Sequence, residues 1–204
     1  MNRKLRISVL VSGGGTNLQA IIDGIETGEI KDAEIVQVIS SSPKAYALER
    51  ATRHGIKTRV IDKNTYREQQ ERSQALLDAL QDEKTDLVVL AGYMSILDET
   101  LVKAFKNRII NIHPSLIPQY CGPGYYGMRV HRAVIEAGEK ESGATVHYVD
   151  EGVDTGPIIM QKKVPVLEGD TPEALAARVL GIEHSILCES IKKIVKSRDN
   201  RQDR

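Results

Sequence analysis

Residues 6–17 read RISVLVSGGGTN, an apolar run that passes into three consecutive glycines. Residues 6–11 are rich in branched apolar side chains and predict a buried strand. From Asn17 onward, apolar residues recur at the spacing of one helix face, and these are Leu18, Ile21, Ile22 and Ile25. A strand, a glycine loop and a helix in this order are typical of the first unit of a parallel sheet.

The same alternation continues along the chain. Further strands are predicted over residues 34–39, 57–61, 86–91, 108–113, 143–149 and 157–166. Further helices are predicted over residues 43–54, 66–84, 98–106, 130–137 and 171–196. The pattern predicts a Rossmann-like, doubly wound α/β fold with a mostly parallel sheet and helices on both faces. We expect one domain over residues 1–196 and a charged, disordered tail over residues 197–204.

The composition excludes several classes of protein. Of the 204 residues, 41% are apolar, which is enough for a packed core. Lys and Arg number 28, as do Asp and Glu, so no overall field attracts nucleic acid or an anionic membrane. No stretch approaches the ~20 apolar residues of a membrane helix, and no signal peptide is visible at the N-terminus. The two cysteines are too few for a disulfide scaffold. We therefore expect a cytoplasmic protein.

The glycine loop is a candidate anion site. Its glycines allow close approach to a ligand, Thr16 and Asn17 add side-chain donors, and the following helix favours negative charge at its N-terminus. A dinucleotide fingerprint would need a glycine where Leu18 stands, and the second strand ends in serines rather than an acidic residue. A single terminal phosphate fits better. The alternative is a tight strand-to-helix turn without a ligand.

A second group of polar residues follows the fifth predicted strand. Asn111 and His113 point to one face of that strand because side chains alternate. An amide donor beside an imidazole suits acyl transfer, which needs a polarised carbonyl and a moved proton. Asp154 lies in an acidic turn, and contact with His113 would raise the imidazole pKa. The alternatives are polar groups satisfied by neighbouring backbone at the strand end, and a solvated turn. His147 precedes this turn, and it is either a second polar group of the site or a residue that is merely packed.

In their order along the chain, these segments resemble one family. The strings are SGGGTNLQAII (12–22), DLVVLAGYMSIL (86–97), NIHPSLIP (111–118) and GATVHYVDEGVDTGPII (143–159), followed by Glu183 and His184. Together they are similar to phosphoribosylglycinamide formyltransferase, the folate-dependent enzyme of purine synthesis. The resemblance covers nearly the whole chain. It implies the formyltransferase fold and transfer of a formyl group from 10-formyltetrahydrofolate to the amine of glycinamide ribonucleotide.

The resemblance also assigns roles to residues. It places the ribonucleotide on Gly14, Gly15, Thr16, Asn17 and Glu183. It places the folate on Arg67, Met94, Ser95, Ile96, Leu97, Asn111, Val149 and Asp150, and it makes Asn111, His113 and Asp154 catalytic. The formyl folate is a co-substrate, and no metal is expected because the histidines and carboxylates lack ligand spacing. The expected partners are these two small molecules, with a homodimer as a possible assembly.

The chain departs from the family pattern in two places. Ser95 stands where many relatives carry arginine, so a side-chain contact at that position is lost. Residues 121–127, CGPGYYG, lengthen a loop that is shorter in some relatives. This loop is either a lid over the phosphoribosyl group or a surface loop that packs on its own tyrosines.

Three other functions compete with this one. A methionyl-tRNA formyltransferase would need an additional basic C-terminal domain, and a formyl-folate deformylase usually has an N-terminal regulatory domain. We expect neither in this chain. A binding module without catalysis would not need Asn111, His113 and Asp154 together, and all three are present.

Overall fold

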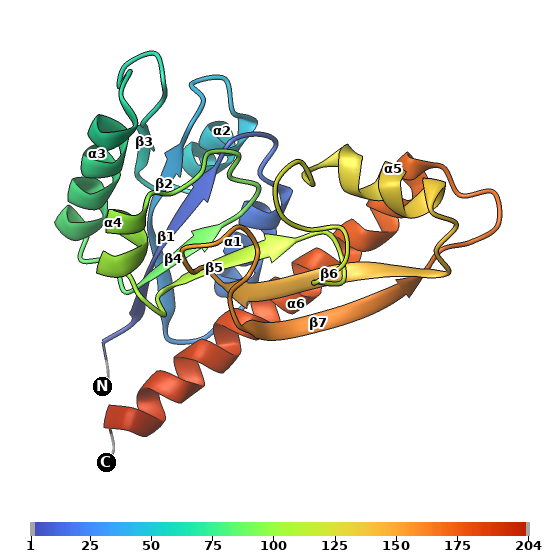
Figure 1. Ribbon diagram of the computed structural model, residues 1–204. Helices are drawn as coiled ribbons and strands as arrows, with labels where there is room; N and C mark the ends of the chain where they lie inside the picture. The colour runs from blue at the N-terminus through green and yellow to red at the C-terminus, as the bar shows by residue number, and fades with distance from the viewer. Residues whose placement is uncertain (1–2, 203–204) are drawn as a thin grey trace.

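A computed structural model describes residues 3–202 and contains one seven-stranded sheet (Figure 1). Its strands are β1 (Leu5–Val11), β2 (Ala33–Ser40), β3 (Thr58–Val60), β4 (Leu87–Leu90), β5 (Ile109–His113), β6 (Glu141–Tyr148) and β7 (Ile158–Pro165). The strand order is β3-β2-β1-β4-β5-β6-β7. The first five strands are parallel, and β6 and β7 run antiparallel at one side. The predicted α/β class with a mostly parallel sheet is confirmed.

Helices cover both faces of the sheet. They are α1 (Thr16–Glu26), α2 (Tyr46–Arg53), α3 (Gln69–Asp82), α4 (Glu99–Ala104), α5 (Met128–Glu136) and α6 (Pro172–Gln202). Alternate residues of β4 enter different cores: Leu87 and Val89 pack with α1 and α6, whereas Val88 and Leu90 pack with α3 and α4. Burial from both sides explains why β4 is apolar throughout. Figure 1 shows α6 passing behind the sheet and extending beyond it.

The order in which successive strands are added to the sheet reverses between β1 and β4. The chain first builds outward through β2 and β3 and then returns to place β4 on the other side of β1. The loops that leave β1 and β4 therefore diverge, and ligands of open α/β sheets bind at such a point. The backbone N–H of Met94 donates to Ser12 Oγ over 2.8 Å and joins the two loops. The end of β5 lies beside them, because β5 pairs with β4.

Three expected helix boundaries are wrong by three residues or more. The helix expected from residue 66 begins at Gln69. The second helix begins at Tyr46 rather than residue 43, because Pro43 and Lys44 form a turn in which Ala45 N–H donates to the carbonyl of Ser42. The last helix continues to Gln202, so residues 197–202 are helical and not the disordered tail that we expected. The rest of that tail, residues 203–204, lies outside the described residues. None of the described helices has an apolar stretch long enough to cross a membrane.

Candidate active site

Asn111 and His113 lie at the carboxyl end of β5. The intervening Ile112 packs into the core shared with α1 and α6, so the two polar side chains point to the opposite face. His113 is 5% exposed. An imidazole buried at the carboxyl end of a central strand is held in place and still borders the crevice beside β4.

Asp154 meets both residues from the loop after β6. Its Oδ2 lies 3.6 Å from His113 Nδ1, and its Oδ1 accepts a hydrogen bond from Asn111 Nδ2 at 3.3 Å. Gly122 N–H also donates to Oδ2 at 3.0 Å. Asp154 has a φ of 58°, which is unusual for a residue other than glycine. Strain of this kind is concentrated at functional sites. The structure thus brings together the three residues to which the sequence assigns catalysis.

The pKa values of both members of this pair are lowered, for different reasons. Burial lowers the pKa of His113, and the hydrogen bond to the Tyr120 carbonyl and the charge of Asp154 offset it only in part. The pKa of Asp154 is lowered in turn, because the neighbouring His147 and His113 and the Gly122 N–H together outweigh burial. Asp154 does act on His113 in the expected direction. The pKa of His113 is nevertheless lowered overall, because burial outweighs the carboxylate.

His147 belongs to the same cluster. It is 1% exposed, and it pairs directly with Asn111 in the ladder between β5 and β6. Its Nδ1 donates to the carbonyl of Tyr148 at 2.8 Å. Its Nε2 is therefore left 3.2 Å from the Asn111 amide nitrogen and 3.5 Å from Asp154 Oδ1. Sequence alone left its role open because the register between the two strands is a tertiary property.

The glycine loop is braced from α2. Ala47 N–H donates to the carbonyl of Gly13 at 3.1 Å, and Arg50 Nε donates to the carbonyl of Gly14 at 2.8 Å. Because a trans peptide places its C=O and N–H on opposite sides, the N–H groups of Gly14 and Gly15 face away from α2. No side chain caps the N-terminus of α1, which begins at the exposed Thr16. This is the arrangement of an anion cradle.

Asn17 joins the glycine loop to α6. One N–H group of its Nδ2 donates to Glu183 Oε2 at 2.8 Å, and the other remains available as a donor. Both residues are buried, and burial raises the pKa of Glu183. Among the described residues, Asn17 Oδ1 has no hydrogen-bond partner although it is buried. The pair therefore leaves one acceptor open beside the glycine loop.

Comparison with known proteins identifies the family. The family model described as formyl transferase matches residues 5–191. The chain belongs to the formyl transferase family. It is 40% identical to phosphoribosylglycinamide formyltransferase of Escherichia coli, over 89% of this chain and 83% of that protein. The crystal structure of glycinamide ribonucleotide transformylase 1 from Symbiobacterium toebii superposes with a TM-score of 0.91 at 45% identity, covering 97% of this chain and 91% of that one.

Some relatives are longer proteins. The chain is 43% identical to the trifunctional purine biosynthetic protein adenosine-3 of Drosophila melanogaster, matching 89% of this chain but 13% of that protein. It matches 62% of the chloroplastic phosphoribosylglycinamide formyltransferase of Vigna unguiculata. The chain therefore spans less than two thirds of these two relatives.

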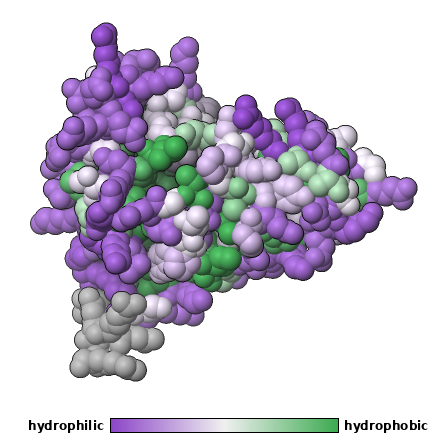
Figure 2. Space-filling view, viewed as in Figure 1, coloured by the Kyte–Doolittle hydropathy of each residue, from purple (hydrophilic) through white to green (hydrophobic). Residues whose placement is uncertain are grey.

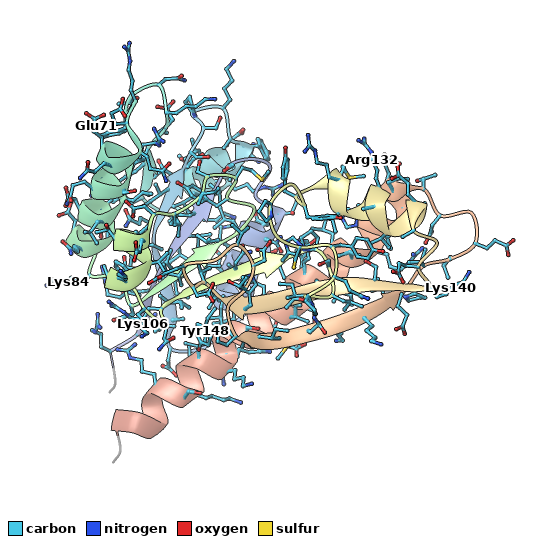
Figure 3. The ribbon with its side chains drawn as sticks, viewed as in Figure 1. Glu71, Lys84, Lys106, Arg132, Lys140 and Tyr148 are labelled. Carbon is cyan, nitrogen blue, oxygen red and sulfur yellow. The ribbon has the colours of Figure 1, made fainter. Side chains whose placement is uncertain are left out.

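This formyl transferase has a hollow between α4 and the loop after β6, and its lining does not include Asn111, His113 or Asp154. A cavity of about 420 Å³ is lined by α4 and the loop after β6, including Val102, Val149 and Asp150. Lys106 and Tyr148 lie close together at its edge (Figure 3). The carboxylate of Asp150 is already engaged, because it accepts from Gly152 N–H and Thr155 Oγ1 and so shapes the loop. Both of these bonds go to Oδ1 of Asp150.

The loop after β4 exposes apolar side chains. Met94 is 54% exposed and Ile96 is 75% exposed, while Leu97 packs toward α3 and α4. Figure 2 shows hydrophobic side chains gathered on this face of the molecule. Ser95 is exposed. Arg67 is exposed in the segment before α3, whose Gln69 Nε2 donates to the carbonyl of Ile96 at 3.4 Å. Arg67 therefore lies near this loop, but no hydrogen bond described for residues 3–202 joins its side chain to it.

Metal ligands are not grouped in the part of the chain that the structure describes. Within residues 3–202, no three side chains of the His, Cys, Asp or Glu type are close enough to hold a metal ion.

Proposed function

We propose that this formyl transferase moves the formyl group of 10-formyltetrahydrofolate to the amine of N1-(5-phospho-D-ribosyl)glycinamide. The products are formylglycinamide ribonucleotide and tetrahydrofolate, as in purine synthesis. The observation that carries the proposal is the convergence of Asn111, His113 and Asp154. The cluster lies at the end of β5, next to β4, which leads into the apolar loop. β4 in turn pairs with β1, which leads into the anion cradle. The names of the relatives support the same reaction.

The amine attacks the formyl carbon, and negative charge develops on the formyl oxygen. Because burial lowers the pKa of His113, the imidazole is neutral at rest and accepts the proton that the attacking nitrogen loses. The imidazolium and the Asn111 amide then donate to the oxyanion. One such donor contributes roughly 3–4 kcal/mol. Asp154 stabilises the imidazolium, and the proton leaves for the departing folate nitrogen.

The two substrates occupy different sides of this cluster. We assign the ribonucleotide phosphate to the N–H groups of Gly14, Gly15 and Thr16, and the sugar to the pair Asn17 and Glu183. Glu183 accepts from a sugar hydroxyl, and the open Asn17 Oδ1 is a second acceptor. We assign the folate to the apolar loop and the adjoining hollow, with contacts from Arg67, Met94, Ser95, Ile96, Leu97, Asn111, Val149 and Asp150. A flat heterocycle suits such a largely apolar slot.

The test is a spectrophotometric assay of folate product with and without glycinamide ribonucleotide. Product that depends on the ribonucleotide supports the proposal. Equal product without it would show hydrolysis, and no product in either reaction would favour a binding module. The assay is repeated with methionyl-tRNA as the acceptor. Formyl transfer to this acceptor would indicate a methionyl-tRNA formyltransferase instead. Ribose 5-phosphate should compete with the ribonucleotide if the glycine loop holds the phosphate.

We also propose a cytoplasmic location and a homodimer. The cytoplasmic location is supported by Cys121 and Cys188, which are both free thiols, as is usual in a reducing compartment. The homodimer is tested by light scattering, and a mass near 22.6 kDa would contradict it.

A further inference from the structure

One short segment contacts both members of the His–Asp pair. The carbonyl of Tyr120 lies 2.9 Å from His113 Nε2, and two residues later Gly122 N–H donates to Asp154 Oδ2 at 3.0 Å. The segment precedes α5 and belongs to neither β5 nor the loop that carries Asp154. It therefore holds the imidazole and the carboxylate in a fixed relation to each other.

The Tyr120 carbonyl decides which imidazole nitrogen carries the proton. A carbonyl oxygen only accepts hydrogen bonds, so His113 Nε2 must be the protonated nitrogen. In the neutral imidazole, the lone pair then lies on Nδ1, which faces Asp154 Oδ2 at 3.6 Å. Nδ1 is thus the nitrogen available to accept and return a proton, and the new N–H formed there points toward a carboxylate.

Tyr120 is held in an unfavourable backbone conformation. Its φ is 51°, in the left-handed region, which costs a residue with a side chain of order 1–3 kcal/mol. The conformation persists only if other contacts fix it. The Tyr120 hydroxyl donates to Glu139 Oε1 at 2.7 Å, and the ring packs edge-on against Tyr125 at 6.1 Å between centroids. The bond to Glu139 raises the pKa of Tyr120 to about 12, so the hydroxyl remains a donor.

We propose that Tyr120 is a positioning residue which, anchored through its side chain on Glu139, fixes the tautomer and orientation of His113. Its backbone carbonyl reserves Nε2 and leaves Nδ1 for proton transfer. Neither Tyr120 nor Glu139 is among the residues that the family resemblance assigns to the site. The kinetic part of this inference rests on the proposed function, whereas the structural part does not.

The titration of His113 also depends on its other neighbours. Asp154 faces it from the loop after β6, His147 from β6 and the buried His131 from α5. These three groups are unchanged by substitutions at Tyr120 or Glu139. A change in the titration of His113 in such variants therefore reports the Tyr120 carbonyl.

The variants Tyr120→Phe and Glu139→Ala remove the anchor from either side. Glu139→Gln keeps an oxygen that accepts from the Tyr120 hydroxyl, and it is the conservative rescue. Glu136→Ala is the matched control, because it removes a carboxylate from an exposed position at the end of α5. Thermal unfolding of each variant establishes that it is folded at the assay temperature.

The first readout is ¹⁵N NMR of the His113 ring in the protein without substrates. We expect the wild-type ring to be a single Nε2–H tautomer at alkaline pH. Tyr120→Phe and Glu139→Ala should give a mixture of tautomers and a lower His113 pKa, because the carbonyl favours the charged ring. Glu139→Gln and Glu136→Ala should resemble the wild type. A wild-type ring protonated at Nδ1, or unchanged spectra in both anchor variants, would overturn the proposal.

The second readout is kinetic. Tyr120→Phe and Glu139→Ala should each lower kcat about tenfold with little change in the KM of either substrate, and combining them should add little further loss. A rise in KM with unchanged kcat would contradict a positioning role. If the wild type transfers no formyl group, the proposed function fails, while the NMR experiment still decides whether Tyr120 sets the state of His113.

Discussion

Asn17 Nδ2 donates to Glu183 Oε2 over 2.8 Å and joins the first turn of α1 to α6 across 166 positions of sequence. The bond places a buried carboxylate directly beside the glycine loop. Burial raises the pKa of Glu183, and the amide of Asn17 offsets this only in part. Burying a carboxylate at this position costs solvation free energy. The simplest explanation for its presence is that it accepts a hydrogen bond from a ligand hydroxyl.

The substitution Glu183→Gln should stabilise the folded protein near neutral pH. A raised carboxyl pKa means that the group's contribution to stability is complete below the ordinary carboxyl pKa and is lost as pH rises through the folded pKa. Glutamine does not ionise, so the variant does not lose stability as pH rises. A gain of about 1 kcal/mol would raise Tm by ~2–4 °C in a chain of this size. The Tm difference should vanish in acid, and an equal difference at both pH values would show that the buried charge is not its cause.

The substitution His113→Ala should lower kcat by about 10²–10⁴-fold, the usual contribution of a positioned general acid or base. The KM for formyl folate should change little, because His113 is not among the residues that we propose as folate contacts. Steady-state kinetics with both substrates varied measures this. A near-normal turnover number would remove His113 from the mechanism.

The substitution Asp154→Asn should move the pH profile of kcat. The charge of Asp154 raises the pKa of His113 against burial, so its removal lowers that pKa further. Because the neutral imidazole accepts the proton of the attacking amine, the rate rises as pH rises through the imidazole pKa. This rise should begin at lower pH in the variant, and the maximum rate should decrease because the imidazolium is no longer stabilised by a carboxylate. An unchanged profile would refute the coupling between the two residues.

The substitution Gly15→Ala should weaken binding of the ribonucleotide and lower Tm. Gly15 has a φ of 73°, and an added Cβ would lie 2.6 Å from Ala47 Cβ, so α2 or the glycine loop must move. Gly28→Ala is the matched control, because Gly28 has a φ of 75° and open space around a Cβ. Both variants lose about 1 kcal/mol or more from the left-handed backbone. Only Gly15→Ala should raise the KM for the ribonucleotide, by at least about tenfold. Equal KM values in the two variants would contradict the cradle.

The local pattern of the sequence was sufficient for the α/β class and for the position of the glycine loop. Strand and helix periods are short-range properties, and the apolar run of β4 already indicates burial from both faces. The helix boundaries were less accurate. The start of α2 depends on a turn at Pro43 and Lys44, and the end of α6 has no proline or glycine to mark it.

Tertiary structure decided which polar groups meet and in what state. Sequence named Asn111, His113 and Asp154, but their contact depends on the register of β5 with β6 and on the path of the loop that follows. Sequence named Asn17 as a side-chain donor and Asp154 as a group that raises the His113 pKa, but it indicated neither the partner of Asn17 nor the burial of His113. Helix packing pairs Asn17 with Glu183, and burial lowers the His113 pKa although Asp154 raises it. Solvation and long-range pairing are properties of the folded chain, and no local pattern encodes them.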